Sequence, residues 1–215
     1  MATYVEGRSA ASDVEPVGLV SEGVAGIAAI VLAVIALAGV SSGILASIVT
    51  IIIGVGLMVQ AFNSAAEASR MAPAGVSGTE VSGEVMVDCL TGIAGIILGV
   101  LALVGINAAH LVPAAVIVFG GALMLSGALE LRPVRTTTAA TTAGPVQIAS
   151  YRGSTAAGGM EILIGIAAIV LGVLSLIFMA SWILVLVGFI AIGAAMLMVS
   201  ATFGGAVMRL FTTTA

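Results

Sequence analysis

Lysine is absent from this sequence, and charged side chains of either sign are few. Of 215 residues, 7% are charged, all six basic residues are arginine, and cysteine and histidine occur once each. Globular domains carry about 25% charged residues. The lack of lysine excludes a polybasic nucleic-acid surface and a Gly-x-x-x-x-Gly-Lys phosphate loop. Because Cys89 and His110 stand alone, we expect no internal disulfide, no metal and no cofactor.

Apolar side chains are abundant instead. They make up 61% of the chain, and they form continuous runs that are long enough to cross a hydrocarbon core of about 30 Å as helices. The runs do not alternate with polar residues, as the strands of a membrane barrel would. We therefore predict an all-α integral membrane protein with six transmembrane helices, whose first partner is the lipid bilayer. The predicted spans are residues 23–40, 44–62, 85–106, 111–129, 160–178 and 182–203.

The arginines indicate the orientation of these spans. All six lie in the two tails or in the connections between spans 2 and 3 and between spans 4 and 5. An even number of spans places those segments on one side of the membrane. Because basic residues favour the cytoplasmic side, we expect a multi-pass protein of the cell membrane with both termini in the cytoplasm.

A repeated motif divides the chain into three similar parts. The motif Gly-Ile-Ala-Ala-Ile-Val-Leu begins at Gly26, and a close copy follows 66 residues later (92 − 26) and again 73 residues later (165 − 92). The same offsets relate Gly54 to Gly120 and Gly193. We therefore predict three tandem helical hairpins with turns of equal length, arranged as a pseudo-threefold bundle. An odd number of such repeats argues against the inverted-repeat plan of many transporters.

The predicted segments follow from this repeat. Residues 136–157, which are rich in threonine, alanine and glycine, are expected to form a flexible surface segment. The segments are an N-terminal tail (1–21), hairpin repeat 1 (22–62), a linker (63–84), hairpin repeat 2 (85–129), a Thr/Ala/Gly-rich linker (130–158), hairpin repeat 3 (159–203) and a C-terminal tail (204–215).

Each odd-numbered span carries small residues at helical spacing. Positions three and four residues apart share one face of a helix, and small side chains allow two helices to approach closely in lipid. We therefore expect these faces to pack against other helices. The predicted packing residues are Gly26, Ala29, Ala33, Gly92, Gly95, Gly99, Gly165, Ala168 and Gly172.

An acidic residue precedes each small-residue face by four positions. These three acids, Glu22, Asp88 and Glu161, are related by the repeat. One interpretation is that they interact with the free N–H groups of the first helical turn and mark the membrane boundary. The other is an ion or proton site built from three carboxylates around the pseudo-axis. His110, at a turn on the far side, is a candidate pH sensor because histidine changes charge between about pH 5 and 8; a solvated turn residue is the alternative.

The motif at each repeat also resembles a known family. Residues 165–176 with 192–198, and residues 92–103 with 120–127, are similar to the short repeat of HdeD-like acid-resistance membrane proteins. The resemblance covers all three hairpins. It implies a six-span membrane protein linked to stress survival, and it supplies no catalytic residue to transfer.

Two function classes follow. A Ser-His-Asp arrangement would require His110, which lies on the side opposite every acid, so we expect no enzyme. Polar residues within the spans are few, and transport pathways usually need several. We therefore predict a non-catalytic membrane protein, either structural and stress-related or an accessory subunit, with copies of itself (a homo-oligomer) or other membrane subunits as partners. The alternative is a proton or cation conduit that uses the three acids, with Ser47 and Thr50 as isolated polar candidates along its path.

Overall fold

The computed structural model describes the backbone of residues 15–71, 83–130, 145–178 and 182–212. Side chains are described for residues 23–66, 83, 85–129, 158–178 and 182–200. Within these ranges the chain is all-helical and contains no strand. The described helices are α1 (Glu15–Leu37), α2 (Ser42–Met71), α3 (Gly83–Leu103), α4 (Ala108–Glu130), α5 (Pro145–Ile177) and α6 (Trp182–Thr212).

Five of the described helices are long and apolar enough to cross a membrane. Their apolar stretches are 19 to 25 residues long, which matches the roughly 20 residues needed to span a hydrocarbon core. In α1 the apolar stretch with described side chains, Gly23–Leu37, is shorter. The five stretches are Ser42–Ala66, Val85–Leu103, Ala108–Leu129, Gly158–Ile177 and Trp182–Ser200. The expectation of a multi-pass, all-helical membrane protein is confirmed at this level.

The turns after α1 and α3 have the same backbone conformation. Gly39 and Gly105 adopt φ values of 93° and 91°, and Ser41 and Asn107 adopt φ values of 38° and 48°. In each turn, glycine occupies the first of the two positions with a positive φ, because it has no Cβ atom to oppose that conformation. The carbonyl groups of Ser41 and Asn107 then accept the first hydrogen bonds of the next helix, from the N–H groups of Leu45 and Leu111.

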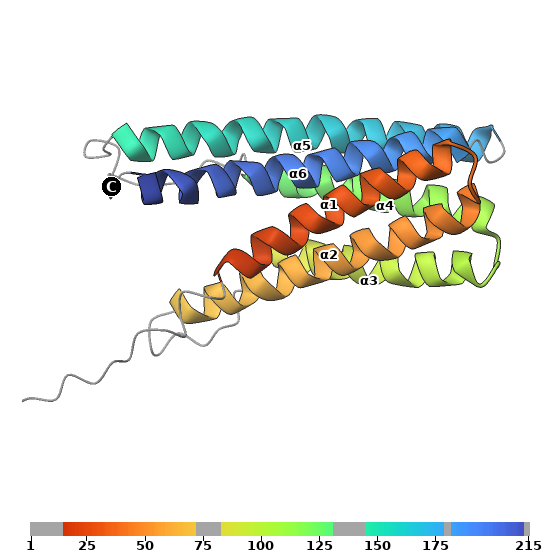
Figure 1. Ribbon diagram of the computed structural model, residues 1–215, viewed down its shortest axis with the longest axis horizontal. Coiled ribbons are helices and arrows are strands. Elements are labelled where there is room, and N and C mark those ends of the chain that lie inside the picture. Colours follow the sequence, from red (N-terminus) through yellow and green to blue (C-terminus); the bar gives the residue numbers. More distant parts are fainter. Residues whose placement is uncertain (1–14, 72–82, 131–144, 179–181, 213–215) are drawn as a thin grey trace, which may run out of the picture.

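The six described helices form a closed ring, and every second helix of that ring also reaches its centre. Each helix packs against the next in the chain, and α6 packs against α1 (Figure 1). Helices α2, α4 and α6 also contact one another at the centre, whereas α1, α3 and α5 make no contact with one another within the described residues. The most extensive contacts are those of α2 with α3 and of α4 with α5, followed by α1 with α6.

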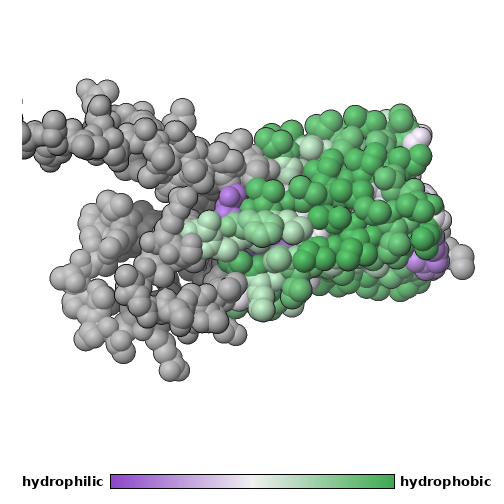
Figure 2. All heavy atoms as spheres, turned by 90° about the horizontal axis from the view of Figure 1, so that it is seen from below, coloured by the Kyte–Doolittle hydropathy of each residue, from purple (hydrophilic) through white to green (hydrophobic). Residues whose placement is uncertain are grey.

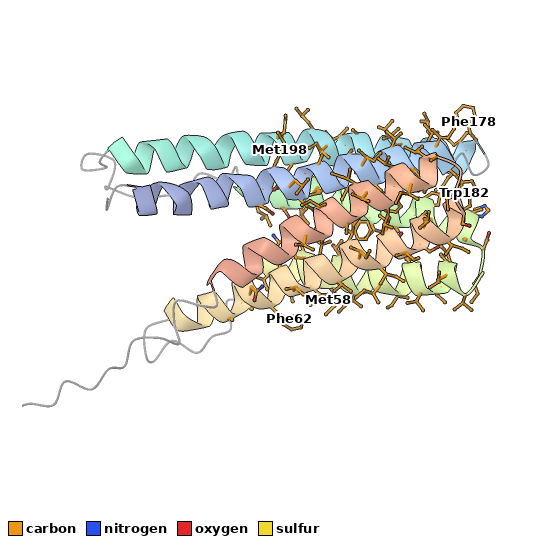
Figure 3. The ribbon with its side chains drawn as sticks, in the orientation of Figure 1. Met58, Phe62, Phe178, Trp182 and Met198 are labelled. Carbon is orange, nitrogen blue, oxygen red and sulfur yellow. The ribbon has the colours of Figure 1, made fainter. Side chains whose placement is uncertain are left out.

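Large side chains fill the centre, and the outer surface is apolar. Phe119, Phe189 and Ile53, from α4, α6 and α2, are among the largest fully buried side chains. Hydrophobic residues cover most of the visible face, with hydrophilic residues at its two ends (Figure 2). Phe178 and Trp182 lie at the end of the bundle where α5 is joined to α6. Met58 and Phe62 lie in the C-terminal half of α2, farther from that end (Figure 3). This surface suits contact with lipid or with other apolar helices.

Several helices continue beyond the predicted spans, whereas α1 and α3 end at Leu37 and Leu103, before the predicted span ends at residues 40 and 106. Helix α1 begins at Glu15, α2 continues to Met71, and α6 continues to Thr212. The prediction of a flexible segment at 136–157 is wrong from Pro145 onward, because α5 begins there. Proline is favoured at the first helical position, and a helix that a span has already nucleated extends at little cost.

Candidate functional site

Three glycines of the predicted small-residue faces lie against glycines of a neighbouring helix. A Cβ atom on Gly92 of α3 would lie 2.7 Å from the carbonyl oxygen of Gly54 on α2. The corresponding distance is 2.5 Å for Gly165 of α5 toward Gly120 of α4, and 2.8 Å for Gly26 of α1 toward Gly193 of α6. In all three pairs backbone meets backbone, so a larger side chain would push the two helices apart.

The other predicted packing residues are also buried in helix contacts. A Cβ atom on Gly95 would lie 2.5 Å from Cζ of Phe119, and Cβ atoms on Gly99 and Gly172 would lie 2.6 Å from Cγ1 of an isoleucine on the adjacent helix. Ala29, Ala33 and Ala168 are completely buried. These faces therefore point into the bundle and leave the opposite faces of α1, α3 and α5 for the surface.

The two acids whose side chains are described are buried, but in different places. Asp88 is 6% exposed and Glu161 is 7% exposed. Asp88 lines a cavity at the centre of the bundle. The Cβ of Glu161 lies against α4, 3.1 Å from where a Cβ on Gly127 would be. The side chain of Glu22, on α1, lies outside the described side chains.

The structure does not bring Asp88 and Glu161 together. Their helices, α3 and α5, pack on α4 and do not contact each other within the described part of the chain. Among the side chains described, no group of three His, Cys, Asp or Glu residues is placed to hold a metal ion.

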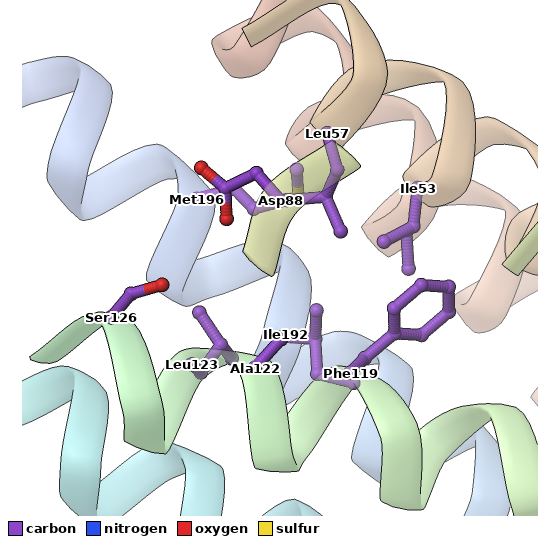
Figure 4. A pocket seen from close by; sticks show the side chains of 9 residues that line it. All are labelled: Ile53, Leu57, Asp88, Phe119, Ala122, Leu123, Ser126, Ile192 and Met196. Carbon is purple, nitrogen blue, oxygen red and sulfur yellow. The ribbon is translucent and has the colours of Figure 1, made fainter. Parts of the chain in front are cut away.

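The cavity at Asp88 has a volume of about 20 Å³ and lies among the three central helices. Its walls are almost entirely apolar. The carboxylate of Asp88 and the hydroxyl of Ser126 lie at one end, and Ile53 and Phe119 lie at the other (Figure 4). Its lining residues are Ile53, Leu57, Asp88, Phe119, Ala122, Leu123, Ser126, Ile192 and Met196.

The two candidate hydroxyls of α2 do not line this cavity. Ser47 and Thr50 are completely buried, and their hydroxyls donate to the carbonyl oxygens of Gly43 and Ala46 one turn earlier, at 2.9 and 2.8 Å. These hydroxyls are therefore bonded to their own helix.

The remaining candidate residues lie at or near the helix ends. His110 is exposed in the first turn of α4. With the proton on Nδ1, it donates to Oδ1 of Asn107 at 2.8 Å. Cys89 is a half-buried free thiol next to Asp88. The geometry of His110 is that of a side chain that helps to fix the turn before α4.

Sequence reasoning missed several polar groups near one end of the bundle. Ser126 lines the cavity, and Oε1 of Gln60 and Nδ2 of Asn63 are buried with no hydrogen-bond partner among the described residues. Gln60 and Ser126 are 66 residues apart (126 − 60), so the repeat offset relates them. This repeat relation is the feature of the sequence that could have identified Gln60 and Ser126 as candidates.

Comparison of the chain with known protein families, with curated proteins and with solved structures finds no match. The functional argument therefore depends on the geometry of the chain itself.

Proposed function

We propose that the chain is a six-span membrane bundle of three tandem helical hairpins around a pseudo-threefold axis. The glycine pairs support this arrangement, because each joins the second helix of one hairpin to the first helix of another. The outer surface supports it as well. Val24, Leu90 and Leu163, which the repeat offsets relate, are 58%, 65% and 64% exposed.

We infer that this bundle is a non-catalytic membrane protein that acts by packing, as a structural or accessory subunit. The observation that carries the proposal is the backbone contact at the glycine pairs, which leaves little room inside for a substrate or a path. The apolar outer surface offers contacts to lipid, to copies of the chain or to other membrane subunits. The motif resemblance to HdeD-like proteins adds a role in stress survival to this proposal.

A second candidate is a proton or cation conduit, and the position of Asp88 favours it. A buried ionisable residue in a membrane bundle is often functional, and Asp88 lines the central cavity. The difficulty for a conduit is the other end of that cavity, where Ile53, Phe119 and Ile192 form its wall. A conduit would require these side chains to move apart.

Flux measurements separate the two candidates. The purified protein is reconstituted into liposomes, and proton and cation fluxes are compared with those of empty liposomes. A packing subunit gives no flux above the empty liposomes. Flux that disappears in Asp88→Asn, and persists in the matched surface variant Met124→Leu, would overturn the proposal and establish the conduit.

A further inference from the structure

The central cavity combines apolar walls with two polar side chains at one end. Two layers of side chains from α2, α4 and α6 form most of its wall. Among the described side chains, the carboxylate of Asp88 and the hydroxyl of Ser126 are the polar groups that line it. Both belong to the pair α3 and α4, so the cavity is asymmetric although the helices around it are arranged as a ring.

The size and chemistry of the cavity determine what can occupy it. A buried water needs about 10–15 Å³ and two to four polar partners. The cavity offers about 20 Å³, which is room for one such molecule. Its two polar groups supply acceptors from the carboxylate, and a donor or acceptor from the hydroxyl.

We infer that this cavity is a binding site for a single water molecule, held between Asp88 and Ser126. The water hydrates the buried carboxylate and links α3 to α4 near the start of α3. Because the other described residues of the wall are apolar, a second water has no polar partner among them. The site is therefore an apolar cavity with polar groups at one end, and we expect a single water there and not the first step of a water chain.

A small cation fits the cavity less well than water does. Hard cations take about six or more oxygen ligands. The lining offers two carboxylate oxygens and one hydroxyl oxygen. A cation would therefore leave most of its coordination positions facing leucine, isoleucine and phenylalanine side chains.

The methyl group of Met196 allows the site to be tested directly. Met196 lines the cavity, whereas Met124 and Met198 are exposed on the outer surface at 40% and 51%. The protein is labelled with ¹³C at its methionine methyls in lipid nanodiscs, and magnetisation transfer from water is measured by NMR. Met196→Leu assigns the signal. We expect a water cross-peak at Met196 and none at the two lipid-facing methionines.

The control must separate a bound water from proton exchange at the serine hydroxyl. Ala122→Val fills the cavity from α4 while Asp88 and Ser126 remain, and Leu57→Phe fills it from α2 if the first variant does not fold. The inference requires that the Met196 cross-peak is lost in a folded cavity-filling variant. It is overturned by the absence of the peak in the wild type, by its persistence in the filled variant, or by a saturable shift of the Met196 signal on addition of sodium or ammonium ions.

Discussion

At the scale of single residues, Gly95 and Phe119 differ from the residues at the corresponding positions of the other two repeats. Those positions hold alanine and isoleucine. The repeat offsets relate Gly95 to Ala29 and Ala168, and Phe119 to Ile53 and Ile192. A Cβ on Gly95 would lie 2.5 Å from the ring of Phe119. The larger ring thus occupies the space that the missing methyl group leaves free.

This pairing predicts a compensated double substitution. Gly95→Ala should destabilise the protein by about 1–3 kcal/mol, because it overpacks a close contact. Adding Phe119→Ile should recover most of that loss, since it reproduces the combination at the repeat-related positions of the other two proposed hairpins. Thermal unfolding in detergent measures the four species of the cycle. Additive effects of the two substitutions would contradict the proposed equivalence of the hairpins.

The glycine pairs predict similar costs at three distant positions. Gly26→Ala, Gly92→Ala and Gly165→Ala should each lower the free energy of unfolding by about 1–3 kcal/mol, because each added methyl meets backbone atoms of the neighbouring helix. The matched control is Gly121→Ala on α4, where a Cβ meets no atom within 4 Å. That variant should be neutral, or more stable by up to about 1 kcal/mol, because alanine favours the helix. Equal effects at Gly121 and Gly92 would show that the helix contacts are not the cause.

At the scale of elements, the two described turns determine how each pair of helices reverses direction. Gly105→Ala should cost about 1–2 kcal/mol, because an L-residue is strained at the positive φ of 91°. Gly39→Ala should behave alike for the same reason. Val104→Ala, in the same turn and 72% exposed, is the control and should change stability little. The measurement is again thermal unfolding, and an unaffected Gly105→Ala protein would mean that the turn adopts a different conformation.

The helices were easier to predict than their ends. The long apolar runs predicted the helical spans, because a membrane leaves few alternatives to a helix for an unbroken apolar segment. The start of α5 at Pro145 was not predicted, since composition alone does not distinguish a polar helix extension from a loop. The small-residue faces were recognisable in the sequence. That Gly92 would meet Gly54 was not, because spacing along one helix does not identify its partner.

The polar site was harder still to predict. Asp88 was recognisable from its repeat, but nothing in the sequence distinguished it from Glu161. Only the packing of α3 against the central helices places Asp88, and not Glu161, at the cavity. The positions of Ser126 and Phe119 at the cavity likewise follow from the packing of the helices and not from the sequence pattern.

At the scale of the whole molecule, the proposed orientation is testable at the two ends of α3. Gly83 and Ile106 are both exposed, and they lie at the start of α3 and just beyond its end. In a Cys89→Ser background, Ile106→Cys should react with a membrane-impermeant thiol reagent added to intact cells. Gly83→Cys should react only after the membrane is permeabilised. The reverse pattern would place both termini outside the cell.

The central proposal is that this bundle acts by packing, and its role as an accessory subunit requires a different membrane protein as the partner. Native mass spectrometry of the wild-type protein, extracted gently from its own membrane, tests that claim most directly. We predict a complex that contains this chain and a different membrane protein in fixed stoichiometry. Recovery of the chain only as a monomer or as a homo-oligomer would contradict the role of accessory subunit.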